Sequence, residues 1–231
     1  DFYFSIKKDL AIAFQQNDEL GNATRELLEV VNFFENKIEK SDAVDASEPY
    51  LLELRKKLSG AVNSLGLSLR MHAYQVYETG ILQNNEGKRI EVSDKFSEGD
   101  QLIVSAAKCY QRALQIEHEN FEDLYPEFLN EFLRQNNIIQ EDVDDTLKLH
   151  VSIEYRSGDL EYCLFLTNYL NLAIDIFGSD IEGFEQDYLS LKELCKLAEA
   201  LMPEGHYYYQ KWLQVKETAE LNGVLQKTPI G

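Results

Sequence analysis

Hydrophobic residues recur with helical spacing from one end of the chain to the other. Between residues 23 and 40, apolar side chains fall at every third or fourth position, namely Leu27, Val30, Val31, Phe34 and Ile38. This period places them on one face of an α-helix. No run of alternating apolar and polar residues is long enough to predict a strand. The pattern therefore predicts an all-α protein.

Turn and capping residues set the expected bounds of the helices. Ser47 precedes Glu48 and Pro49, the arrangement of an N-cap followed by a proline in the first turn, and a long helix should run from there to about Thr79. Gly158, Gly178 and Gly223 stand where helices should end, and Pro203 should stop another. The other helices are expected at residues 2–16, 23–40, 126–135, 141–156, 159–177, 181–202 and 206–221.

Residues 80–100, rich in Gly, Asn and charge, form the longest stretch without helical spacing. We therefore expect a long loop there. Loops of this length in a compact domain are mobile or functional. Ser97 and Asp100 have the spacing of a capping pair that would open the next helix. The sequence thus predicts one all-α domain over residues 1–231, with eight or nine antiparallel helices in an array of helical hairpins or a large bundle.

The segment SAAKCYQRALQIEHEN, residues 105–120, resembles the second helix of a tetratricopeptide repeat in the spacing of Ala106, Tyr110, Ala113 and Leu114. The segment VNSLGLSL, residues 62–69, is similar to the first helix of that family, in which Gly66 would be a point of close contact. The resemblance implies that small residues let two helices approach while Tyr110 fills the groove between them. His118 replaces the family's closing proline, and no strict period of about 34 residues fits the chain.

The net charge of -19 is unevenly distributed and narrows the choice of partner. Residues 1–120 carry 14 basic and 20 acidic side chains, or -6, whereas residues 121–231 carry 8 and 21, or -13. Such a surface repels phosphate, so we expect no direct binding of nucleic acid.

No stretch of about 18 uncharged apolar residues is present, so we expect no membrane insertion. Cys109, Cys163 and Cys195 lie in apolar segments and should be buried free thiols, which favours a cytoplasmic or other reducing compartment.

Residues with catalytic or metal-binding chemistry are scattered. The four histidines lie far apart and lack the spacing of metal ligands on one helix face. The segment QIEHENFED, residues 115–123, gathers acidic residues around His118, but we expect neither a specific metal nor a cofactor. The acidic residues at 141–145 lack the pattern of a calcium loop and should instead complement the positive end of a helix. Catalysis stays an open question, and a non-catalytic protein is favoured.

The sequence therefore predicts a protein-interaction or scaffold module that grips a peptide or helix of a partner protein. The acidic second half favours a basic partner segment. Two alternatives stay open: a helical domain that senses a small molecule or peptide, and an accessory domain of a larger enzyme. The candidate partner contacts are Tyr169, Glu182, Glu185, Asp187, Tyr207 and Tyr209.

Overall fold

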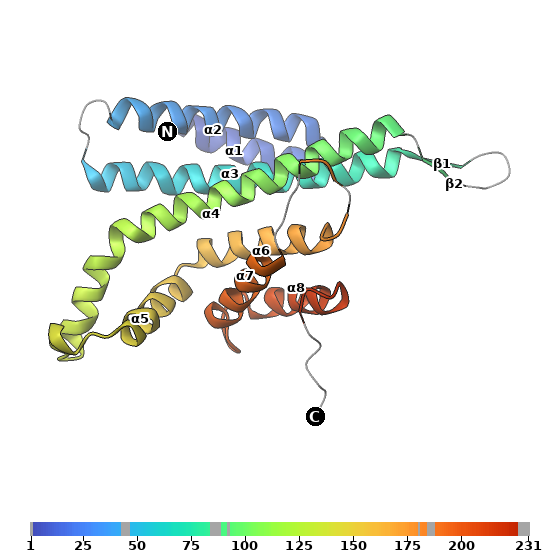
Figure 1. The fold of residues 1–231 in the computed structure, drawn as a ribbon. Coiled ribbons are helices and arrows are strands. Elements are labelled where there is room, and N and C mark those ends of the chain that lie inside the picture. Colours follow the sequence, from blue (N-terminus) through green and yellow to red (C-terminus); the bar gives the residue numbers. More distant parts are fainter. Residues whose placement is uncertain are drawn as a thin grey trace. The chain divides into compact units, whose positions relative to one another are not determined.

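The computed structural model describes residues 2–42, 47–83, 89–91, 93–179, 181–183 and 188–225. They form eight α-helices, a short 3-10 helix and one antiparallel pair of three-residue strands (Figure 1). The all-α prediction is confirmed. The elements are α1 (Phe2–Gln16), α2 (Leu20–Asp42), α3 (Glu48–Thr79), β1 (Ile81–Gln83), β2 (Arg89–Glu91), α4 (Ser93–Gln135), η1 (Gln140–Asp142), α5 (Asp145–Gly158), α6 (Leu160–Asp175), α7 (Tyr188–Leu201) and α8 (Tyr209–Leu221).

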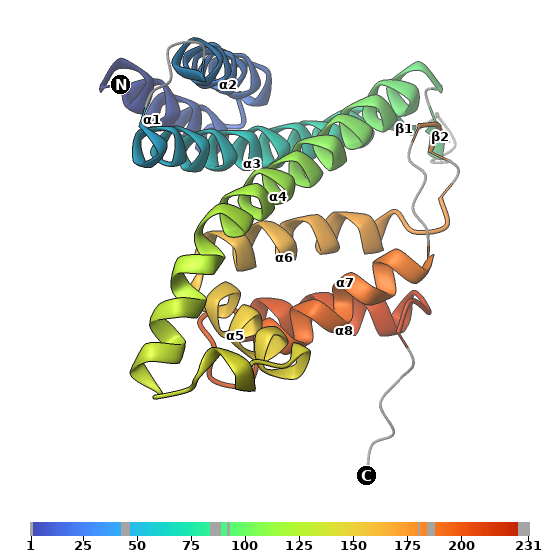
Figure 2. The same cartoon turned by 60° about the vertical axis from the view of Figure 1, so that its left-hand side comes forward.

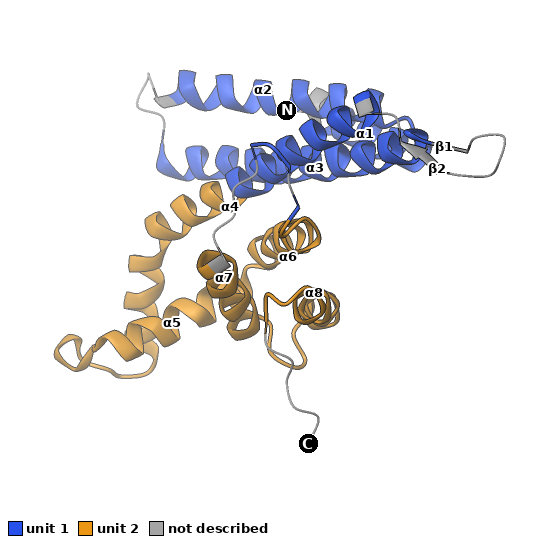
Figure 3. Cartoon of the chain, turned by 45° about the vertical axis from the view of Figure 1, so that its right-hand side comes forward, with its two compact units in different colours: residues 1–113, 179–185 blue, residues 114–178, 186–231 orange. Residues whose placement is uncertain are grey.

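The chain divides into two compact units (Figure 3). Unit 1 comprises residues 1–113 and 179–185, and unit 2 comprises residues 114–178 and 186–231. Helix α4 contributes its first half to unit 1 and its second half to unit 2. Each unit has its own set of buried apolar side chains, so each is described separately below.

In unit 1, α2 packs against both α1 and α3, and α3 lies beside the first half of α4 (Figure 2). Small side chains line the contact between α3 and α4. Ala106 and Ala113 are completely buried, and a Cβ atom added to Gly66 would lie only 2.9 Å from the ring of Tyr110. This confirms the expectation that Gly66 is a point of close contact. Tyr110 fills the space that these small residues leave.

Helices α1 and α2 are also joined by charge. The Nζ atom of Lys7 lies 2.6 Å from a carboxylate oxygen of Glu26 and 2.6 Å from one of Glu29. Hydrogen bonds to the two carboxylates, Glu26 first, raise the pKa of Lys7 well above its usual value. Lys7 therefore stays charged throughout the neutral range and bridges the two helices.

Helix α6 is the centre of unit 2. Ten of its residues are buried, so it is surrounded by protein on most sides, as a helix that is apolar nearly all round must be. Helices α5, α7 and α8 pack against it (Figure 2). Asp159 begins α6, because its Oδ1 atom accepts hydrogen bonds from the backbone N–H groups of Glu161 and Tyr162, both at 3.1 Å. Trp212 of α8 completes the core and is 2% exposed.

The loop expected at residues 80–100 is much shorter in the structure. Strands β1 and β2 pair within it, and α4 already begins at Ser93. Ser97 and Asp100 therefore lie inside α4 and do not cap it. Asp100 instead accepts a hydrogen bond of 2.6 Å from the hydroxyl of Tyr77 on α3, which adds a polar contact to the packing of α3 on α4.

Several helix boundaries also differ from the predicted ones, three of them for clear reasons. A single helix, α4, includes Pro126, where two helices were expected. Helix α5 begins at Asp145 rather than 141, because the side chain of Asp144 accepts a hydrogen bond of 2.8 Å from the N–H of Leu147 and so caps it. Helix α7 begins at Tyr188 rather than 181, because Gly183 has a φ of +84°, which an α-helix cannot include.

The predicted helix ends agree better with the structure. Gly178 and Gly223 follow α6 and α8 with φ angles of +79° and +75°, the left-handed conformation expected just after a helix. Helix α3 spans Glu48–Thr79 as expected, with Pro49 in its first turn. Ser47 occupies the N-cap position with extended backbone, but its side chain makes no capping hydrogen bond.

Candidate functional site

The most unusual part of unit 2 is the run of residues 114–161, called here the acidic segment. It contains the second half of α4, η1, α5 and the start of α6. Thirteen of its side chains are Asp or Glu and only three are Lys or Arg. Eleven of the thirteen carboxylates are exposed. The concentration of negative charge that the sequence places in the second half of the chain therefore lies mainly on these helices.

Aromatic rings hold α4 and α5 together within the acidic segment. The ring of Tyr155 on α5 lies 5.5 Å from that of Phe121 and 4.7 Å from that of Phe128, both on α4. The hydroxyl of Tyr125 donates a hydrogen bond of 2.7 Å to the carbonyl of Lys148. Burial raises the pKa of Tyr155, so this phenol stays neutral in the contact at physiological pH. The inner face of the segment is thus packed with aromatic side chains.

Arg156, near the end of α5, is the polar centre of this contact. Its guanidinium lies 4.0 Å from the centre of the Phe121 ring and donates hydrogen bonds to the hydroxyl of Tyr162, at 3.0 Å, and to Nδ1 of His118, at 2.9 Å. A cation over an aromatic face is stabilised by the ring's negative face. Burial raises the pKa of Tyr162, while the neighbouring Arg156 lowers it. Arg156 therefore links α4, α5 and α6.

The outer face of α4 carries a line of carboxylates at every fourth position, called here the acidic ridge: Glu119, Asp123, Glu127 and Glu131. All four are exposed. With 100° of rotation per residue, the ridge points roughly 150° away from the aromatic face of Phe121, Tyr125 and Phe128. One helix therefore turns aromatic side chains inwards and carboxylates outwards.

The few basic side chains of the acidic segment are engaged within it. Arg134 lies 2.7 Å from Glu131, and this hydrogen bond, followed by one from Gln135, lowers the pKa of Glu131 to about 2. Lys148 lies 3.5 Å from Asp145. Arg156 is held by Tyr162 and His118, as described above. The four exposed carboxylates of the ridge thus outnumber the three basic side chains of the whole acidic segment.

Apolar side chains are also exposed on the acidic segment. Ile139, Leu149 and Leu160 are 59%, 62% and 43% exposed. Leu149 lies on α5, Ile139 precedes η1, and Leu160 begins α6. A surface that combines negative charge with accessible leucine and isoleucine suits a partner with both basic and apolar side chains.

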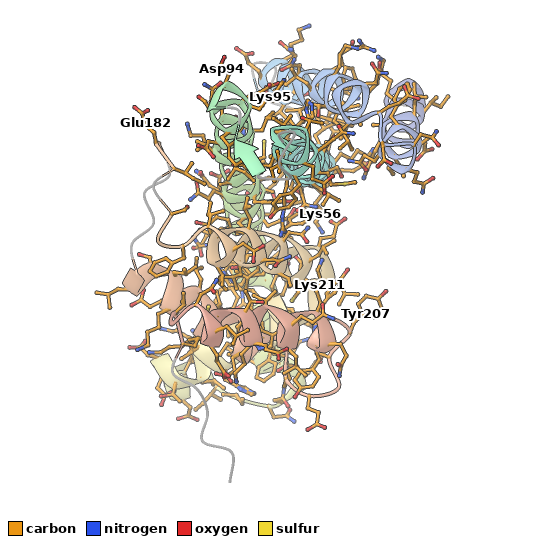
Figure 4. All side chains as sticks on the ribbon, turned by 90° about the vertical axis from the view of Figure 1, so that its right-hand side faces the viewer. Lys56, Asp94, Lys95, Glu182, Tyr207 and Lys211 are labelled. Carbon is orange, nitrogen blue, oxygen red and sulfur yellow. The ribbon has the colours of Figure 1, made fainter. Side chains whose placement is uncertain are left out.

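The residues proposed from sequence as partner contacts differ in exposure where the structure describes them. Tyr169 is buried at 3% exposure in α6, and Tyr207 is 76% exposed just before α8. Tyr209 is half-buried, and Glu182, in unit 1, is exposed. The side chains of Glu182 and Tyr207 both point away from the ribbon (Figure 4). Glu185 and Asp187 lie outside the described residues, and the role of all six stays a prediction.

The sequence does contain a signal for the acidic ridge, in the four carboxylates spaced at i, i+4, i+8 and i+12. From the sequence, the acidic residues around His118 are considered only as metal ligands. In the structure His118 contacts Arg156 instead, and Glu117 is buried at 3% exposure. No group of three or more His, Cys, Asp or Glu side chains in the described part of the chain is arranged to hold a metal ion.

The three cysteines are free, as expected, and only Cys109 is partly exposed. Burial raises the pKa of Cys163 to about 12 and the pKa values of Cys109 and Cys195 to about 11. All three thiols therefore stay protonated at neutral pH, and a protonated thiol is a poor nucleophile.

Among the helices of the described ranges, none combines the length and apolar character needed to cross a membrane.

Comparison with known proteins gives no assignment. No family model, no curated protein and no solved structure matches the chain.

Proposed function

We propose that the protein is an interaction module that binds a segment of a partner protein rich in Lys and Arg on the acidic ridge of α4. The observation that carries this proposal is the imbalance of thirteen acidic to three basic side chains over residues 114–161, with exposed Leu149 and Ile139 in the same segment. Apolar residues between the basic ones in the partner would contact these exposed side chains.

Physical chemistry defines what each part of such a surface would contribute. Exposed ion pairs are individually weak, typically about 0.2–1 kcal/mol, and salt screens them. A line of carboxylates acts together to attract a basic segment and raises the association rate more than it slows dissociation. The apolar contacts would then set how long the complex lasts. The tetratricopeptide resemblance is in keeping with this function, because repeats of that kind bind extended partner segments.

The test uses the whole chain and two synthetic peptides, one with Lys at every third or fourth position and Leu between, the other with each Lys replaced by Glu. We expect the basic peptide alone to bind. Glu119→Gln, Asp123→Asn and Glu127→Gln together remove three ridge charges and should weaken binding by about tenfold, because three exposed pairs are worth about 1–2 kcal/mol. Surface plasmon resonance at low and high salt measures the effect.

The matched control removes the same charges from unit 1, through Asp9→Asn, Glu39→Gln and Glu78→Gln. These residues are exposed on helices, as the ridge residues are. We expect the control to bind the basic peptide within about twofold of the wild type. If both triple variants lose affinity equally, the peptide responds only to net charge, and the ridge is not a binding site.

A further inference from the structure

His206 connects three helices of unit 2 through its two ring nitrogens. Its Nε2 atom donates a hydrogen bond of 2.9 Å to the carbonyl of Ser157 at the end of α5. Its Nδ1 atom accepts one of 3.1 Å from the backbone N–H of Tyr208, just before α8. The hydroxyl of Ser157 in turn donates to the carbonyl of Leu201, the last residue of α7, at 2.8 Å. A proton on Nδ1 would remove the acceptor that Tyr208 uses.

His118 contacts Arg156, the residue before Ser157 on α5. Its Nδ1 atom lies 2.9 Å from the guanidinium of Arg156. An arginine has only donors, so Nδ1 must be the acceptor and the imidazole must be neutral. A protonated His118 would face Arg156 with a like charge. The carboxylate of Glu122, 3.8 Å from the same Nδ1 atom, would then be its favoured partner.

We propose that His118 and His206 form a pH-sensitive latch on the end of α5, closed when both imidazoles are neutral and opened when they are protonated. On protonation His118 changes partner from Arg156 to Glu122, and His206 loses its bond to Tyr208. The Nε atom of Arg156 is buried without a hydrogen bond in the described structure, so even the closed latch leaves one donor of this guanidinium unsatisfied. That deficit favours release.

Several other titratable groups lie around the two histidines. Facing His118 and Arg156 are Glu117 and Glu122 on α4, Tyr155 on α5 and Tyr162 on α6. Burial raises the pKa of both tyrosines, so they stay protonated.

Three titratable side chains lie around His206. They are the Tyr208 phenol, Glu161 and Cys163, with the pKa of Tyr208 and of Cys163 raised by burial. Glu117, the residue before His118 in the chain, is buried.

The experiment is hydrogen exchange of the whole chain at about pH 7.5 and about pH 5.5, with rates divided by the intrinsic rates at each pH. We expect protection of α5 and of residues 203–209 to fall by about five- to thirtyfold at the lower pH relative to α6, because two hydrogen bonds are lost. Nitrogen-15 NMR of the wild-type imidazoles at the higher pH should show Nδ1 unprotonated in both histidines. A protonated Nδ1 in either one would overturn the proposal without any variant.

Two substitutions replace each acceptor by one that cannot be protonated. Gln at position 118 can accept from Arg156, and Asn at position 206 can accept from an N–H two residues on, as in an Asx turn. We expect His118→Gln with His206→Asn to abolish the acid response. The control is His150→Gln on α5, where His150 lies 4.0 Å from Glu154 across one turn, much as His118 lies near Glu122. The control should respond to acid as the wild type does. An undiminished response in the double variant would refute the latch.

Discussion

The two halves of α4 are packed by opposite kinds of side chain. In unit 1 the helix meets α3 through glycine and alanine, so closely that a methyl group on Gly66 would collide with Tyr110. In unit 2 the same helix meets α5 through Phe121, Phe128 and Tyr155, with Arg156 between the rings. The first contact depends on small side chains and the second on large ones.

This difference determines what each unit tolerates. A close contact between small residues is destabilised by added volume, whereas an aromatic contact is destabilised by lost volume. The contact in unit 2 also contains an arginine that hydrogen-bonds to His118, whereas the polar contact in unit 1 joins Tyr77 to Asp100. The chain has a single tryptophan, Trp212, and it lies in the core of unit 2. Its fluorescence therefore follows unit 2 alone, while far-ultraviolet circular dichroism follows both units.

The largest expected effect is that of Phe121→Ala. Its ring contacts Tyr125, Tyr155 and Arg156, so truncation leaves a cavity and removes the surface on which the guanidinium rests. We expect the free energy of unfolding of unit 2 to fall by about 3–5 kcal/mol. Urea unfolding followed by Trp212 fluorescence measures it. An unchanged fluorescence midpoint would mean that the aromatic contact does not stabilise unit 2.

An intermediate effect is expected for Gly66→Ala in unit 1. The new Cβ atom would lie 2.9 Å from Tyr110 and 3.2 Å from the Cβ atom of Cys109, so the helices must separate, at a cost of about 1–3 kcal/mol. Circular dichroism should show earlier unfolding of one part of the helix signal. Gly21→Ala is the control, because no atom lies within 4 Å of its added Cβ, and it should unfold no earlier than the wild type.

The smallest effect compares one tyrosine hydroxyl in each unit. The hydroxyl of Tyr110 is buried and has no hydrogen-bond partner in the described structure, whereas that of Tyr162 accepts from Arg156. We expect Tyr110→Phe to stabilise unit 1 by about 1 kcal/mol and Tyr162→Phe to destabilise unit 2 by about 1 kcal/mol. Chemical denaturation of both variants measures the change in the free energy of unfolding. Changes of the same sign in the two variants would contradict the comparison.

Much of the fold could be predicted because local signals agree with the packing. Pro49 marks the start of α3, and the Gly178 and Gly223 turns follow α6 and α8 in the left-handed conformation. The small-residue contact was also foreseen, because Gly66 and the alanines near Tyr110 have the spacing of closely packed helices. These features depend on residues a few positions apart, which the sequence displays directly.

One error arose where packing overrides a local rule. Pro126 usually interrupts a helix, but the aromatic stripe of Phe121, Tyr125 and Phe128 keeps its phase across it, and packing on α5 maintains α4. The latch could not have been predicted, because His118, Arg156 and His206 are far apart in the chain and meet only after folding. The division into two units likewise depends on long-range contacts.

Helices α5 and α6 are joined by one residue, since Asp159 both ends the first and caps the second. In kinematic terms this is a joint with a single pair of backbone torsions. Helix α5 has 14 residues and is about 21 Å long, so a rotation of about 10° at Asp159 moves its far end by about 4 Å. The capping bonds of Asp159 hold the pivot on α6. Small changes at Arg156 and Ser157 are thus magnified along the helix, where Leu149 and the carboxylates near Asp145 lie.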